Sequence, residues 1–267
     1  MIKRVAMGAA LVALAAVVVH FGGWVQLIAF MLLCGTSLHE MSGLFKAKGH
    51  RPRVWPGYVF ALAGGLALQL FGAMAMLGAY LLCMVGLAAV CVFDAKCSGF
   101  DALCSLFIFI YPLSFYAILI LVAFYSDFAI SRAALLLCVA APSLADMAAF
   151  FVGTFLGKHP LCPRISPKKT VEGSVGSFLG GFIGGVVVYL LQGIWGAALP
   201  FWHLAGLGLL FGGLGQVGDL FASLLKRWAD IKDYGQLFPG HGGVMDRLDS
   251  ILMCAPVVFL YLYCIPW

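Results

Sequence analysis

Long, uninterrupted runs of apolar residues alternate with short polar segments along the chain. The apolar positions are continuous and do not alternate at every second residue, which favours helices over strands. A helix crosses roughly 30 Å of hydrocarbon with about 20 apolar residues, and inside lipid it satisfies its own backbone hydrogen bonds. The pattern therefore predicts an all-α, polytopic integral membrane protein.

The predicted transmembrane helices number about nine: Val5–Val19, Trp24–Met41, Gly57–Met76, Leu77–Phe93, Leu103–Tyr125, Ala133–Leu156, Gly173–Leu191, His203–Leu225 and Ser250–Ile265. The boundary between the third and fourth of them is the least well defined. We expect residues 1–267 to form a single membrane domain, in which 1–140 supply N-terminal helices and 141–267 carry the candidate chemistry.

Basic residues lie almost entirely on one side of this predicted membrane. If Lys3 and Arg4 are cytoplasmic, 15 of the 16 Lys and Arg residues face the cytoplasm, and Arg132 alone faces outward. Cytoplasmic loops of membrane proteins carry such an excess. We therefore predict a cytoplasmic N-terminus and an external C-terminus, in the inner (cytoplasmic) membrane of the cell. The net charge of +5 then reflects orientation and indicates no nucleic-acid partner.

Composition agrees with this class. The chain is 63% hydrophobic and 10% charged, whereas soluble domains are roughly 45–50% apolar and about 25% charged. So little polar surface cannot cover so large an apolar interior. A soluble globule is thus excluded, and so is a disordered chain, which needs low hydrophobicity and high charge.

Two acidic residues, Asp146 and Asp219, fall within predicted spans. A carboxylate at the centre of a span costs about 2.5–3.5 kcal/mol, so it normally faces a polar cavity and has a partner. On a helix Asp219, Ser223 and Lys226 share one face, and Arg227 follows. A buried structural contact remains the alternative interpretation of both carboxylates.

A charged, glycine-rich connection follows this helix. It contains Lys232, Asp233, His241, Gly242 and Gly243. Beyond it Asp246 and Asp249 share one face if the chain is helical from Val244 onward, with Arg247 beside them.

This set of residues suits phosphate chemistry. Carboxylates are preferred ligands of Mg²⁺, Lys and Arg neutralise phosphate oxygens, and a glycine-rich turn lets backbone N–H groups approach an anion. We therefore predict metal-assisted phosphoryl or nucleotidyl transfer at the cytoplasmic membrane face. A solvated loop would explain the cations but not Asp219, Asp246 and Asp249.

A second basic segment, Ser166–Gly173, precedes the seventh predicted span. Ser166 or Thr170 is expected to cap that helix, with Glu172 in its first turn. Lys168 and Lys169 beside a helix N-terminus could also bind phosphate, so capping alone and capping with anion binding both stay open. Residues Gly213–Gly218 match G-x-G-x-x-G but lie in an apolar helix, where the glycines either allow close packing or open room beside Asp219.

These segments resemble the phosphatidate cytidylyltransferase (CDP-diacylglycerol synthase) family over residues 146–255. The resemblance rests on Ser223–Arg227, Lys232–Asp233, Pro239–Asp249, the S-P-K-K-T-x-E-G element at Ser166–Gly173, and Asp146 with Gly153. The sequence departs from the family's pattern at Phe150, Val171 and Ala222, where Tyr, Trp and Glu are usual.

The resemblance implies that CTP and phosphatidate react to give CDP-diacylglycerol and pyrophosphate. It implies a helical homodimer in the lipid bilayer, with Mg²⁺ as cofactor and a second cation left open. It assigns Asp219, Asp246 and Asp249 to the metal, and Asp219, Asp246, Lys226 and Arg227 to catalysis. The substrate-binding residues it implies are Asp146, Ser166, Lys168, Lys169, Thr170, Glu172, Ser223, Lys232, Asp233, His241, Gly242, Gly243 and Arg247.

Two alternative functions use similar residues. A CTP-dependent lipid kinase would employ the same metal and phosphate groups but release CDP. An ion-coupled secondary transporter would also carry acidic residues within its spans.

Overall fold

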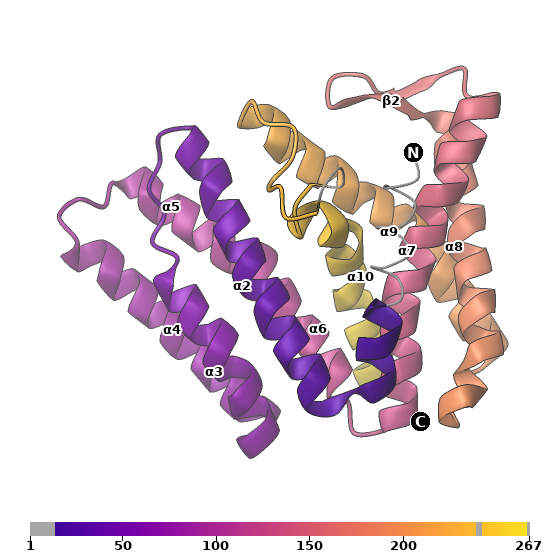
Figure 1. The fold of residues 1–267 in the computed structure, drawn as a ribbon, viewed down its shortest axis with the longest axis horizontal. Helices are drawn as coiled ribbons and strands as arrows, with labels where there is room; N and C mark the ends of the chain where they lie inside the picture. Colours follow the sequence, from indigo (N-terminus) through magenta and orange to yellow (C-terminus); the bar gives the residue numbers. More distant parts are fainter. Residues whose placement is uncertain (1–13, 239–241, 266–267) are drawn as a thin grey trace. The chain divides into compact units, whose positions relative to one another are not determined.

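The computed structural model describes residues 14–238 and 242–265. Most of them are helical (Figure 1). The elements are α2 (Gly23–Ala47), α3 (Trp55–Phe71), α4 (Ala73–Phe93), α5 (Gly99–Ile108), a π-helical turn (Phe109–Ser114), α6 (Phe115–Ala123), α7 (Phe128–Leu156), β1 (Pro160–Cys162), β2 (Ser166–Thr170), α8 (Val171–Leu191), a 3₁₀ turn (Gln192–Trp195), α9 (Phe201–Trp228) and α10 (Met245–Cys264).

The prediction of an all-α polytopic membrane protein is confirmed in outline. Within the described ranges, seven helical segments are long and apolar enough to cross a membrane, and α3 is a shorter apolar helix of 17 residues. The first predicted span, Val5–Val19, lies largely outside the described residues.

Several predicted boundaries are wrong. The third and fourth helices separate at Gly72, whose φ of 86° lies in the left-handed region that favours glycine, and not at Met76. Helix α2 runs to Ala47, so Glu40 lies inside the helix and not at its end. Hydropathy marks only the apolar part of a helix, whereas backbone hydrogen bonding continues into its polar ends.

Contacts divide the chain into two compact units. Unit 1 contains Met1–Leu121 and Trp228–Arg247, and unit 2 contains Val122–Arg227 and Leu248–Trp267. Each has its own buried residues, such as Leu38, Phe60 and Tyr116 in unit 1, and Leu204 and Phe211 in unit 2. The expectation of one membrane domain stays a prediction.

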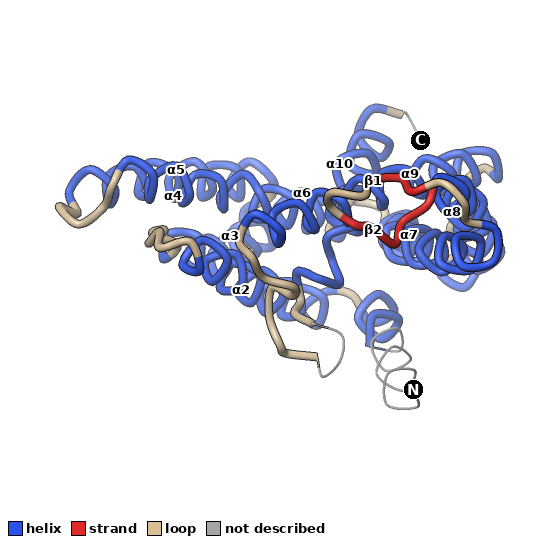
Figure 2. The backbone as a smooth tube through the Cα atoms, turned by 90° about the horizontal axis from the view of Figure 1, so that it is seen from above, coloured by secondary structure: helices blue, strands red, loops and turns tan. Residues whose placement is uncertain are grey.

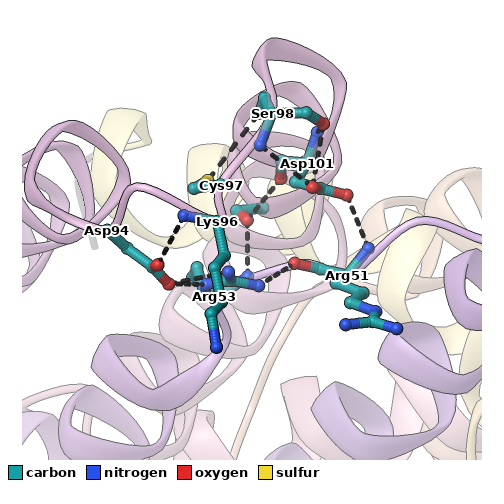
Figure 3. Close-up of polar contacts among 8 residues, drawn as sticks. Arg51, Arg53, Asp94, Lys96, Cys97, Ser98 and Asp101 are labelled. Atoms are coloured by element: carbon teal, nitrogen blue, oxygen red, sulfur yellow. Dashed lines mark hydrogen bonds and ion pairs between the residues drawn. The ribbon is translucent and has the colours of Figure 1, made fainter.

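In unit 1, a polar cluster joins the α2–α3 connection to the start of α5 (Figure 3). Arg53 Nε donates to Asp94 Oδ2 at 2.7 Å, and the Arg51 N–H donates to Asp101 Oδ1 at 2.5 Å. Ser98 and Asp101 form a capping box that begins α5. The Lys96 N–H and the Arg53 guanidinium both lower the pKa of Asp94 by favouring its charged form.

In unit 2, α8 packs closely against α7 and α9 through glycines. A Cβ atom on Gly184 would lie 2.5 Å from Ala141 Cα of α7, and one on Gly181 would lie 2.7 Å from the Gly212 nitrogen of α9. Small residues allow this approach, which lets membrane helices associate without a hydrophobic driving force. Among the α9 glycines expected to allow packing, a Cβ atom on Gly213 would lie 2.8 Å from the Phe178 ring of α8, which confirms that role for this position.

A short antiparallel hairpin, formed by β1 and β2, links α7 to α8 (Figure 2). The sequence analysis did not predict it, because Pro160, Pro163 and Pro167 obscure any alternation of apolar and polar residues. This hairpin carries the basic segment that precedes α8.

We expect Gly208→Ala to destabilise the protein by about 1–3 kcal/mol, the usual cost of overpacking. The added methyl group would lie 2.8 Å from the Gly185 nitrogen of α8. Gly206→Ala on the same helix is the matched control, because nothing lies within 4 Å of its Cβ position. Thermal unfolding in detergent measures both, and equal melting temperatures would contradict the packing.

Candidate active site

An ion pair in unit 2 joins the two segments singled out in the sequence. Lys169 Nζ of β2 lies 2.6 Å from Asp219 Oδ2 of α9. The nitrogen is buried, and within residues 14–238 and 242–265 no acceptor other than Asp219 reaches it. The two charges therefore stabilise each other, although the Lys169 and Asp219 side chains are 24% and 32% exposed.

The base of the hairpin fixes the position of Lys169. Thr170 caps α8, because its Oγ1 accepts the Gly173 N–H at 3.1 Å. Glu172 accepts the Lys158 and His159 N–H groups at 3.1 and 3.3 Å, and its other oxygen lies 2.7 Å from His159 Nδ1. The predicted cap is thus confirmed, and anion binding by this segment stays a prediction.

Helix α9 contacts the hairpin again about two turns further along, at Arg227. Ser223 Oγ donates to Asp219 Oδ1 at 3.4 Å, so these two residues share a face of α9 as predicted. Arg227 Nε donates to the Ile165 carbonyl at 3.4 Å. The last two turns of α9 thus lie along the hairpin that holds Ser166, Lys168 and Lys169.

Asp249 of α10 lies close to the same charges. Its side chain is buried, and its Oδ1 accepts the Ser250 N–H at 2.7 Å. The negative charges of Asp219 and Asp146 repel the Asp249 carboxylate, whereas the positive charge of Lys226 attracts it. A Cβ on Gly218 would lie 2.6 Å from the Asp249 carbonyl, so α9 and α10 approach closely here. Asp219 and Asp249 thus lie on parts of α9 and α10 that pack closely together.

Asp246 belongs to unit 1, where it organises the connection before α10. Its Oδ2 accepts the Tyr234 and Gly243 N–H groups at 2.8 and 2.9 Å. Gly242 has a φ of 82°, and a Cβ there would lie 2.6 Å from Asp246 Oδ2. Glycine is therefore required beside this carboxylate.

A further carboxylate of unit 1, Glu40 of α2, also holds this connection. Its two oxygens accept the Val244 and Met245 N–H groups at 2.9 and 2.8 Å, and its side chain is buried. Glu40 was not among the predicted site residues, because the predicted helix Trp24–Met41 placed it at a helix end, where a carboxylate needs no buried partner.

Four further predicted residues lie at the surface. Lys168, Lys232, Asp233 and Arg247 are exposed. His241 lies outside the described residues.

The acidic side chains have the chemistry that a Mg²⁺ site needs. Among the described residues, no three His, Cys, Asp or Glu side chains lie close enough together to form a metal-binding group. The donors are carboxylates, which Mg²⁺ prefers. The donor set therefore fits the ion.

Fold and site together define a helical, multi-span membrane protein with an ion pair between α9 and the hairpin and a buried carboxylate on α10. The family model described as the cytidylyltransferase family matches residues 2–265. The chain belongs to that family.

Among its relatives are proteins named phosphatidate cytidylyltransferase. That of Synechocystis sp. is 44% identical over 119 residues, which cover 44% of this chain and 39% of the relative. That of Bacillus subtilis is 43% identical over 117 residues, covering 44% and 42%. That of Mycobacterium bovis is 41% identical over 121 residues, covering 45% and 38%. The match thus spans about two fifths of each relative's length.

We expect Glu172→Ala to speed amide hydrogen exchange several-fold at Lys158 and His159, because both N–H groups lose their acceptor. Lys168→Ala is the matched control, since this exposed residue lies on the same hairpin. Unchanged exchange in the Glu172 variant would contradict the role assigned to this carboxylate.

Proposed function

We propose that this protein is a phosphatidate cytidylyltransferase, which converts CTP and phosphatidate to CDP-diacylglycerol and pyrophosphate. Membership of the cytidylyltransferase family over residues 2–265 supports the reaction class. The names of the relatives support the two substrates.

The observation that carries the proposal is the ion pair of Lys169 with Asp219. It unites the lysine-rich segment, suited to phosphate, with the carboxylate suited to a metal ion. Either residue alone would be an ordinary polar residue. Together they supply the positive charge that a nucleotide phosphate requires and the negative charge that its cation requires.

The reaction exchanges one phosphoanhydride bond for another. An oxygen of the phosphatidate phosphate attacks the α-phosphorus of CTP, and the bond from that phosphorus to the β-phosphate oxygen breaks, releasing pyrophosphate. No general base is needed, because the lipid phosphate is already ionised near neutral pH. Catalysis then consists mainly of positioning and charge stabilisation.

The basic residues neutralise the phosphates in this scheme. Lys226 and Arg227 act on the reacting phosphates, and the other phosphate-binding residues are Ser166, Lys168, Lys169, Lys232 and Arg247. Asp219, Asp246 and Asp249 hold Mg²⁺, which when bound supplies positive charge to the phosphate oxygens. Asp146, Ser223, Asp233, His241, Gly242 and Gly243 complete the substrate-binding set, with Thr170 and Glu172 at the base of the hairpin.

We further propose nine spans, a cytoplasmic N-terminus and an external C-terminus in the inner membrane. The distribution of basic residues supports this orientation. In this orientation soluble CTP reaches the site from the cytoplasm, and phosphatidate reaches it from the adjoining leaflet. A homodimer is proposed from the family resemblance.

We expect the purified protein to transfer labelled cytidine from CTP to phosphatidate only when Mg²⁺ is present. Asp219→Asn should abolish turnover, because it removes the charge that pairs with Lys169 and the metal. Asp127→Asn is the matched control, since Asp127 caps α7 and Asn caps a helix equally well.

Other outcomes of this assay contradict the proposal. Phosphate transfer without cytidine would indicate a lipid kinase, and solute transport in liposomes without nucleotide turnover would indicate a transporter. Full activity of Asp219→Asn would contradict the metal assignment.

We expect Arg132→Ala to leave kcat/KM nearly unchanged, whereas Lys226→Ala should lower it at least tenfold, about 1.4 kcal/mol. Arg132 lies 3.7 Å from the Phe128 ring centroid at the start of α7, on the side proposed to be external. Comparable losses in the two variants would show that the proposed orientation is wrong.

A further inference from the structure

Glu40, the one acidic residue of α2, is buried. It is 5% exposed, and its bonds reach residues more than 200 positions away in the sequence. Its partners, the Val244 and Met245 N–H groups, lie at the start of α10, where backbone N–H groups lack partners within the helix. Glu40 therefore acts as a helix cap supplied by another helix.

Asp246, in the first turn of α10, also binds backbone N–H groups of the residues that precede this helix. Asp246 accepts the Tyr234 and Gly243 N–H groups, so Glu40 and Asp246 together bind four backbone N–H groups between residues 234 and 245. Tyr234 and residues 243–245 are thus held by two acidic side chains.

The neighbouring glycines show how tightly Glu40 is enclosed. A Cβ on Gly235 would lie 2.9 Å from Glu40 Cδ, and one on Gly243 would be closer still. A larger residue at either position could fit only if the Glu40 carboxylate moved away from its N–H partners. Both glycines therefore preserve the contact of Glu40 with α10.

We propose that Glu40 is a positioning residue, which holds the start of α10 so that Asp246 presents its carboxylate to the metal ion. The proposal rests on the function proposed above, since it takes Asp246 as a metal ligand. Partners that orient a metal ligand commonly change metal affinity 10–100-fold when they are removed.

Glu40→Gln tests the proposal with minimal change of shape. The amide keeps one acceptor oxygen but turns an NH₂ group toward the second backbone N–H, which then loses its partner. Ser37→Ala is the matched control. Ser37 is a buried residue of the same helix, and it bonds Tyr116 instead of the connection before α10.

Two measurements separate positioning from general stability. Amide hydrogen exchange of the purified full chain should be at least tenfold faster at Val244 and Met245 in Glu40→Gln, and unchanged there in Ser37→Ala. Mn²⁺ binding, followed by electron paramagnetic resonance of the free ion, should weaken at least tenfold in Glu40→Gln alone. A purely structural role would lower the folded fraction without changing the affinity of the folded protein for Mn²⁺.

Gly235→Ala provides a second test. It should weaken Mn²⁺ binding in the native background and add no further loss in a Glu40→Ala background, because the methyl group acts by displacing Glu40. Independent, additive losses would overturn the proposal, and so would native Mn²⁺ affinity in Glu40→Gln. Absence of cytidyl transfer by the unaltered protein would instead refute the proposed function, and the exchange measurement would still report on the contact.

Discussion

A carboxylate placed within an apolar helix must have a positive or hydrogen-bonding partner, and this constraint shapes both units of the protein. In unit 2, Asp219 pairs with Lys169, so the hairpin must lie against α9. In unit 1, Glu40 takes backbone N–H groups of α10, so the connection that precedes α10 must lie against α2. Without such partners each charge would cost several kcal/mol. The surrounding glycines and caps serve to bring the partners within reach.

The helices themselves could be predicted from the sequence because lipid permits so few backbone structures. Their ends were harder to predict, since they depend on local features that hydropathy does not measure. Gly72 separates two helices through its backbone conformation alone, and Asp127 begins α7 by accepting two N–H groups. The hairpin of β1 and β2 was missed because its prolines and lysines indicate a loop.

The candidate site could be predicted where residue type and spacing determine it. Asp219 and Ser223 share a helix face because four residues make about one turn. The pairing of Lys169 with Asp219 joins residues 50 positions apart, and the cap supplied by Glu40 joins residues 204 positions apart. No local pattern encodes such distant contacts, which arise only when helices pack. Sequence therefore indicates the chemistry available, and tertiary structure selects the partners.

The central proposal is that aspartates of α9 and α10 hold a divalent cation. Crystals of the protein soaked in Mn²⁺ test it most directly, through a map of anomalous scattering. The account predicts a strong peak within coordination distance of carboxylate oxygens of Asp219, Asp246 and Asp249. A map with manganese bound elsewhere, or with these three side chains bare at saturating Mn²⁺, would contradict it.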